Sequence, residues 1–197
     1  MPCNPAYARL LREPATGEML LHYTRTSMDG DHSRTFLYHL VPRHNLLING
    51  DLWMCTSEAW WRFPIGNTNL VVYRLPRQSA DDGCFLATNC GAPSCTPGQS
   101  VYQDVPLAGV RARRLAFGGV LASEGGPATV TVALFQLSAE GAVLTNSALA
   151  VSLGGSTYQP ARQEVVLLPN AATLRFQLYL QDPATLHADR MFIEVLD

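Results

Sequence analysis

Lysine is absent from the 197-residue chain, and charged residues of every kind are scarce. All 14 basic residues are arginines, charged residues make up 15% of the chain, and the net charge is −2. No segment forms the dense positive surface that nucleic-acid binding needs, so we expect no nucleic-acid partner. No apolar run reaches the ~20 residues of a membrane-spanning helix, so we expect no membrane span.

Recognisable signals for export and for catalysis are also missing. Residues 1–5 contain no basic segment leading into an apolar one, so no secretory signal is visible. We therefore expect a virion or another extracellular particle as the location, with secretion after signal removal as the alternative. The chain has no G-x-S-x-G, H-E-x-x-H or phosphate-binding glycine motif, and its five histidines are scattered. His187 falls in an expected solvated loop between Asp182 and Asp189. We expect no enzymatic activity and no catalytic residues.

The five cysteines leave two interpretations open. Cys84, Cys90 and Cys95 lie in a segment rich in glycine, proline and asparagine, and the odd total leaves one thiol free or paired between chains. Their spacings are longer than those of zinc sites, and no histidine is near. A disulfide that staples this loop, such as Cys90–Cys95, and separate thiols in a reducing compartment are both compatible with the pattern.

Short branched or aromatic segments alternate with turns along most of the chain. In residues 173–180, leucine and phenylalanine alternate with arginine, glutamine and tyrosine, which is typical of an antiparallel strand with one face in a core. No segment shows helical periodicity over three turns. The expected strands are 69–75, 84–88, 100–105, 111–123, 128–137, 148–153, 163–168, 173–180 and 190–196. The sequence predicts an all-β fold, an antiparallel β-sandwich or jelly roll.

Residues 1–43 differ from the rest and predict a short β-rich arm before a sandwich domain of residues 44–197. Strands are expected at 9–13, 18–25 and 34–41, separated by turn residues at 14–17 and 27–33. Three short strands cannot bury a core alone. We expect the arm to dock on the main domain, on a neighbouring copy or on other structural subunits, which favours a homo-oligomer.

Four segments of the main domain resemble one family in the correct order. They are N-L-L-I-N-G-D-L at 45–52 with Trp60-Trp61 after it, G-C-F-L at 83–86, S-V-Y-Q-D-V at 100–105 and M-F-I-E-V-L at 191–196. Together they resemble carbohydrate-binding modules with the galactose-binding-like jelly-roll fold. The opening phrase also resembles phage tail and fibre proteins, which join a docking arm to a distal binding domain. Leu52-Trp53 departs from the Phe-Glu that is usual in the family.

The resemblance implies a non-catalytic glycan-binding or adhesion module, as part of a phage-like fibre, spike or head decoration that contacts a cell-surface polysaccharide. The alternative is a purely structural virion or assembly subunit that uses the sandwich for protein contacts. A small hydrolase with this fold is a third hypothesis.

Flat aromatic side chains with polar groups at the rim are the usual platforms for sugar rings. Trp60 and Trp61 are adjacent, so in a strand they point to opposite faces, and one belongs to the core. Arg175, Gln177 and Tyr179 share one face of a strand, which is either a binding strip or an ordinary solvated face. The candidate ligand-binding residues are Trp60, Trp61, Tyr102, Arg175, Gln177 and Tyr179.

The resemblance also implies a structural calcium ion. The matching positions are Asp51 and Glu194, with backbone oxygens near Asn49, and such hard oxygen ligands suit Ca²⁺.

Overall fold

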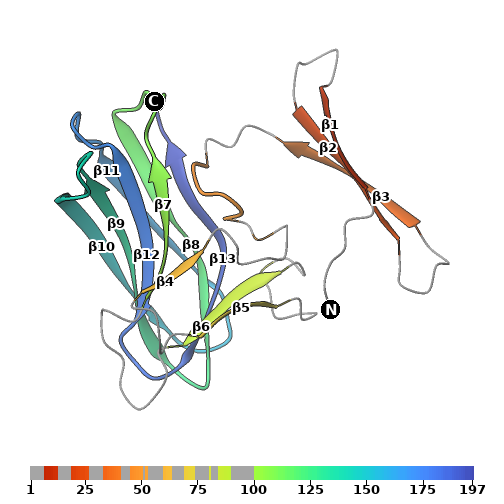
Figure 1. The fold of residues 1–197 in the computed structure, drawn as a ribbon. Coiled ribbons are helices and arrows are strands. Elements are labelled where there is room, and N and C mark those ends of the chain that lie inside the picture. Colours follow the sequence, from red (N-terminus) through yellow and green to blue (C-terminus); the bar gives the residue numbers. More distant parts are fainter. Residues whose placement is uncertain are drawn as a thin grey trace. The chain divides into compact units, whose positions relative to one another are not determined.

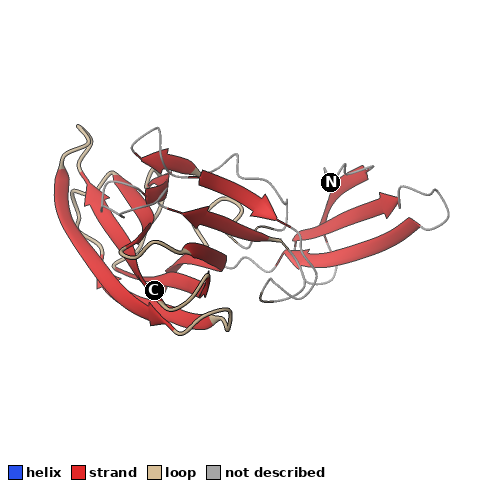
Figure 2. Cartoon of the chain, turned by 90° about the horizontal axis from the view of Figure 1, so that it is seen from below, coloured by secondary structure: helices blue, strands red, loops and turns tan. Residues whose placement is uncertain are grey.

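The chain divides into two compact units, Met1–His44 and Asn45–Asp197. The computed structural model describes residues 7–12, 19–26, 33–40, 45–50, 52, 60–63, 69–73, 80, 84–89 and 100–197 (Figure 1). For the strands before residue 45, for 61–63 and 69–73, and for residue 89, it describes the backbone alone. The described residues contain no helix (Figure 2), hence none with the length and hydrophobicity to cross a membrane.

The first unit is a three-stranded antiparallel sheet. Its strands are β1 (Tyr7–Arg12), β2 (Met19–Thr26) and β3 (Ser33–Leu40), in the order β1-β2-β3. Each strand overlaps its predicted range, and the predicted turns between them lie outside the described residues. What this unit docks on remains a prediction.

The second unit contains two five-stranded antiparallel sheets in its described residues. The β12 sheet has the order β10-β9-β12-β7-β4, and the β13 sheet has the order β11-β8-β13-β6-β5. Their strands are β4 (Trp61–Phe63), β5 (Asn69–Tyr73), β6 (Phe85–Asn89), β7 (Ser100–Pro106), β8 (Arg114–Glu124), β9 (Ala128–Leu137), β10 (Val143–Leu153), β11 (Gln159–Val166), β12 (Thr173–Leu180) and β13 (Thr185–Val195). From β7 on, every connection except β9–β10 crosses between the sheets, as in a jelly roll. The predicted sandwich is confirmed.

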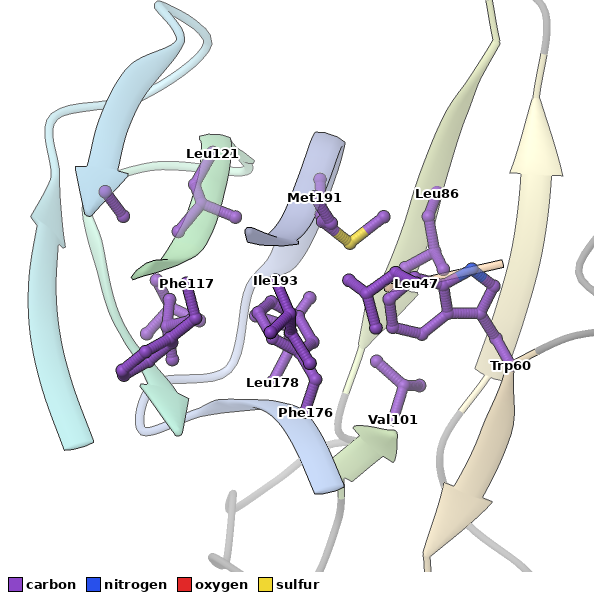
Figure 3. Close-up of a cluster of buried hydrophobic side chains, with 14 of the residues drawn as sticks. Leu47, Trp60, Leu86, Val101, Phe117, Leu121, Phe176, Leu178, Met191 and Ile193 are labelled. Carbon is purple, nitrogen blue, oxygen red and sulfur yellow. The ribbon is translucent and has the colours of Figure 1, made fainter. Parts of the chain in front are cut away.

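Alternation along the strands builds the core between the two sheets. In β12, Leu174, Phe176 and Leu178 are fully buried, while the residues between them are half-buried on the outward face. Phe176 meets Phe117 of the opposite sheet edge-on, with ring centroids 6.5 Å apart (Figure 3). Burying each such leucine or phenylalanine contributes roughly 1.5–3 kcal/mol, so packing fixes the inward face of β12.

Two polar residues of the family-like motifs clamp the entry segment onto the sheets. The Asn45 carboxamide donates to Met191 O and accepts from the backbone N–H of Leu47 and Ile193, each at 3.0 Å. Gln103, only 3% exposed, accepts from Ile48 N–H at 2.6 Å and donates to Ile48 O at 3.0 Å. Because these side chains satisfy backbone groups that no strand partner reaches, the motif specifies the fold at these positions.

Gly50 makes a close approach to a bulge in β13. The pairing of β13 with β8 shifts register between Asp189 and Phe192, and Met191 N–H donates to Gly50 O at 2.8 Å. A β-carbon on Gly50 would lie 2.1 Å from Met191 O, so only glycine fits.

Two strands begin five residues earlier than predicted. β10 begins at Val143, where residue 148 was expected, and β13 begins at Thr185, where residue 190 was expected. The expected loop around His187 was therefore wrong. His187 lies inside β13, paired with Ala87 of β6 and Ala122 of β8. Its neighbours Asp182 and Asp189 made the segment look like a turn, but Asp189 is fully buried beside the bulge and accepts from Ala80 N–H.

Candidate functional site

The outward faces of the two sheets differ in chemistry. On the β13 sheet, Arg162 donates to Glu194 at 3.0 Å, and its guanidinium carbon lies 5.5 Å from the centre of the Phe192 ring. A second pair joins Arg114 to Glu164. These side chains are substantially exposed, so the pairs contribute little stability and make an ordinary charged surface.

The β12 sheet instead holds an ordered aromatic and polar group on its outward face. Arg175 of β12 is bound to Asp104 of β7 through two parallel hydrogen bonds, Nε to Oδ1 at 2.7 Å and Nη2 to Oδ2 at 2.8 Å. The same guanidinium lies over the Tyr102 ring, 4.4 Å from its centre. The hydrogen bonds with Asp104 raise the pKa of Arg175, so the guanidinium stays charged in this ion pair.

Strand register explains why these side chains meet. Arg175 is the cross-strand partner of Asp104, and Gln177 is the partner of Tyr102, two positions further along β12. Diagonal neighbours on one face lie within reach of long and aromatic side chains, which lets Arg175 cover Tyr102. Alternation in β7 puts Asp104 on the same face as Tyr102, so both partners come from a single strand.

Gln177 and Tyr179 continue the row along β12. The Gln177 amide donates to Ser100 Oγ at 2.6 Å, and Tyr179 is the cross-strand partner of Ser100 and of Thr131. Both side chains are half-buried. The hydrogen bond holds the Gln177 side chain in one orientation, which is the preorganisation that a binding surface needs.

The row continues onto β9. Phe135, half-buried, pairs with Arg175 in register, and Ala133, fully buried on the same outward face, pairs with Gln177. Ala133 is fully covered by its neighbours, so Phe135 is the member of this row that reaches the surface. We call Tyr102, Phe135, Arg175, Gln177 and Tyr179 the aromatic strip.

The structure brings together four of the six predicted ligand-binding residues and separates a fifth. Tyr102, Arg175, Gln177 and Tyr179 lie in the aromatic strip. Trp60 does not, because it is 4% exposed and packs edge-on against Phe176 at 6.0 Å, inside the core (Figure 3). Trp60 is thus the core member of the tryptophan pair, and its proposed platform role is corrected.

Trp61, the sixth predicted residue, is the backbone partner of Tyr102 in β4, and its side chain lies outside the described residues. Sequence reasoning missed Asp104, Ser100 and Phe135. For Asp104 the signal was available, because it follows Tyr102 by two residues and therefore shares its face.

The predicted calcium site fits poorly with the residues that the structure describes. Glu194 Oε2 accepts from Arg162 at 3.0 Å, so a guanidinium already neutralises this carboxylate, and Asp51 lies outside the described residues. Within the described part of the chain, no group of three His, Cys, Asp or Glu side chains could hold a metal ion. Calcium binding stays a prediction, and melting with calcium and with a chelator tests it.

Two buried groups lie away from the strip. His187 is 6% exposed, stacks on Phe85 with ring centres 4.5 Å apart, and has Nε2 3.2 Å from Glu124 Oε2. Burial lowers the pKa of His187, and the nearby Glu124 carboxylate opposes this only in part. Cys84 is 2% exposed and disulfide-bonded, and the other four cysteines lie outside the described residues.

No protein-family model matches the sequence, and no curated protein matches it. Solved structures do match the fold. The CBM22-1 xylan-binding domain of Paenibacillus barcinonensis Xyn10C is 12% identical with a TM-score of 0.55, covering 78% of this chain and 92% of that domain. TmCBM61 in complex with β-1,4-galactotriose is 11% identical with a TM-score of 0.56, covering 77% and 99%.

A phage protein has the same fold in one part of its chain. The enzymatically active domain of tailspike protein 4 from bacteriophage CBA120 is 12% identical with a TM-score of 0.58, over 78% of this chain but 22% of the tailspike chain. A Clostridium thermocellum Xyn10B chain with CBM22-1 and GH10 modules is likewise matched over 28% of its length. At these identities the likeness shows a shared β-sandwich fold.

Proposed function

We propose that this chain is a non-catalytic glycan-binding module, and that the aromatic strip is its binding surface. The observation that carries the proposal is the guanidinium of Arg175, which is held by Asp104 and stacked on Tyr102. Sugar rings have apolar C–H faces and a polar rim, so an aromatic surface edged by fixed hydrogen-bonding groups suits them.

The charge balance of the strip favours an uncharged polysaccharide. The charge of Arg175 is offset by Asp104, and the other members of the strip are neutral. A neutral sugar chain can accept hydrogen bonds from the remaining guanidinium N–H groups without bringing a charge that the site must compensate. Structural neighbours whose ligands are xylan, xylohexaose or galactotriose support this class of ligand.

Non-catalytic action is part of the proposal. The neighbouring xylan-binding domain and TmCBM61 are matched over 92% and 99% of their length, and both are binding modules. In the Xyn10B chain the GH10 module is a separate part. The members of the aromatic strip include no nucleophile beside a base, and the carboxylate next to it, that of Asp104, is bound to Arg175.

A direct test is a screen of the full chain against plant, bacterial and capsular polysaccharides, followed by calorimetry with the soluble oligosaccharides of any that bind. We expect micromolar to millimolar binding to a neutral glycan. Binding that survives unchanged in a Tyr102→Ala variant would place the site elsewhere, and no binding to any glycan would count against the function.

A second candidate function is that of a structural subunit of a phage-like particle, with the first unit docking on other subunits. The separate compact unit Met1–His44 and the tailspike neighbour favour it. The disulfide at Cys84 is compatible with a particle or a secreted protein outside the cell, because such bonds persist in oxidising surroundings. A ring or trimer that is lost when the chain is shortened to 45–197 would support this function.

A further inference from the structure

The edge of the β12 sheet at β10 carries little of the protection that sheet edges usually have: its pairing with β9 is irregular only at its start, between Val143 and Thr145. β10 runs for 11 residues, Val143–Leu153, and among the described residues it pairs with β9 alone. Its sequence, VLTNSALAVSL, contains no charged residue and no proline. An edge strand exposes a row of unpaired N–H and C=O groups, and proteins normally protect it with charges, proline or bulges against pairing with another chain.

The corresponding edge of the β13 sheet is protected. β11 begins with Gln159-Pro160, and its exposed positions include Arg162 and Glu164, both in ion pairs. Proline removes one ladder donor, and the charged side chains oppose a neighbouring strand. The two edges therefore differ within one molecule, which indicates that the β10 edge is left open for a partner.

We propose that β10 is a homodimer interface, in which two copies of the chain pair their β10 strands antiparallel. The strand is compatible with itself. With a two-fold axis at Ala148, Asn146 faces Ala150 of the second copy, so small neutral side chains meet and no like charges are opposed. About 35 Å of strand is available for main-chain hydrogen bonds.

Burial along β10 points to the same partner. On the outward face Asn146, Ala148 and Ala150 are exposed, and on the core side Leu149 and Val151 are only partly buried although they pack against the core. An added strand would cover these core-side residues. The two-fold pairing uses the β10 edge of both copies, so assembly through this edge closes at two.

The dimer has a consequence that rests on the proposed function. Antiparallel pairing makes one continuous sheet, so the aromatic strips of both copies face the same side. Two sites on one surface bind a repetitive polysaccharide with an avidity well above the affinity of one site.

Sedimentation velocity of the full chain, without glycan, between about 1 and 100 µM tests the interface. We expect a monomer–dimer equilibrium for the wild type and a roughly tenfold or greater weakening in Ala148→Lys, because two lysines would then oppose each other at the axis. Ala139→Lys, the same change at an exposed turn residue, should leave the dimer intact.

Two outcomes overturn the proposal: a wild type that stays monomeric at 100 µM, or an oligomer that Ala148→Lys leaves unchanged, which would assign assembly to the first unit or another surface. If Ala148→Lys fails to fold, Ala150→Lys and hydrogen exchange decide instead. Amides of 143–153 should exchange more slowly at high protein concentration, and unchanged exchange contradicts the interface. Because no glycan is present, the result is independent of whether the chain binds sugar.

Discussion

The guanidinium of Arg175 covers the ring of Tyr102 at 4.4 Å, and it does so from the neighbouring strand of the same sheet. A cation held over an aromatic face by two hydrogen bonds to Asp104 has little freedom to turn. The ring and the guanidinium therefore act as one rigid surface.

Removing the Tyr102 ring should abolish most of the glycan affinity without unfolding the chain. Tyr102→Ala is expected to weaken binding by roughly tenfold or more, since a stacked ring contributes about 0.5–1.5 kcal/mol beyond its buried area. Calorimetry of both proteins with the same oligosaccharide measures this. Tyr158→Ala, which removes a half-buried ring before β11 of the other sheet, is the matched control and should bind as the wild type does.

Replacing Arg175 by lysine tests whether glycan binding depends on the positive charge or on the flat guanidinium. Arg175→Lys keeps the positive charge but loses the parallel pair of hydrogen bonds with Asp104 and the flat contact with Tyr102. We expect several-fold weaker binding and a nearly unchanged melting temperature, measured by calorimetry and by thermal melting. Wild-type affinity in this variant would show that the stacked guanidinium has no part in binding.

Gly50→Ala should destabilise the sandwich strongly. The added β-carbon would approach Met191 O to 2.1 Å, and this backbone carbonyl belongs to the β13 bulge and cannot move alone. A cost of about 3 kcal/mol in the free energy of unfolding is expected from urea titration. At Gly154 the nearest atom to a β-carbon is a glutamine side-chain nitrogen at 3.9 Å, so Gly154→Ala should cost far less.

The free energy of unfolding should decrease as the pH is lowered, because of His187. Its pKa is lowered in the folded chain by burial, so the unfolded chain takes up this proton first as the pH falls below the ordinary value of about 6.5. The stabilisation from the neutral, buried His187 is therefore fully present above pH 6.5. It is lost as the pH falls toward the lower pKa that His187 has in the folded chain. His187→Gln should flatten this part of the stability profile. Glu124→Gln should lower the pKa of His187 in the folded chain further, because it removes the carboxylate that raises this pKa. The loss of stability should then extend to lower pH. Identical profiles for all three proteins would contradict the assignment.

Reducing agent should lower the melting temperature through Cys84. Loss of a native disulfide typically costs about 2–4 kcal/mol, and here it also frees a residue in the core cluster. Thermal melts with and without reductant measure the shift. In Cys84→Ala the melting temperature should start lower and respond much less to reductant.

Much of the fold follows from alternation in the sequence, whereas the site depends on register. The pattern in 128–137 and 173–180 predicts β9 and β12 at their observed bounds, because each places a continuous apolar row on one face. It also predicts that Arg175, Gln177 and Tyr179 share the other face.

The remaining features require information that periodicity does not carry. Asp104 and Tyr102 meet Arg175 because β7 lies beside β12 in the sheet. This strand order is set by long-range packing, which periodicity does not show. Trp60 and Trp61 are adjacent and chemically identical, so the sequence does not indicate which ring is buried. The structure shows that Trp60 packs against Phe176. The polar run around Asp189 resembles a turn because the bulge that buries its carboxylate depends on a distant strand.

The most direct test of the central claim is a titration of the ¹⁵N-labelled chain with a soluble neutral oligosaccharide that it binds, followed by NMR. The account predicts saturable shift changes at the backbone amides of Tyr102 and Tyr179 and at the Arg175 side-chain Nε–H, with the outward residues Arg162 and Glu164 of the β13 sheet unaffected. Shift changes confined to the β13 sheet or to the first unit would contradict it.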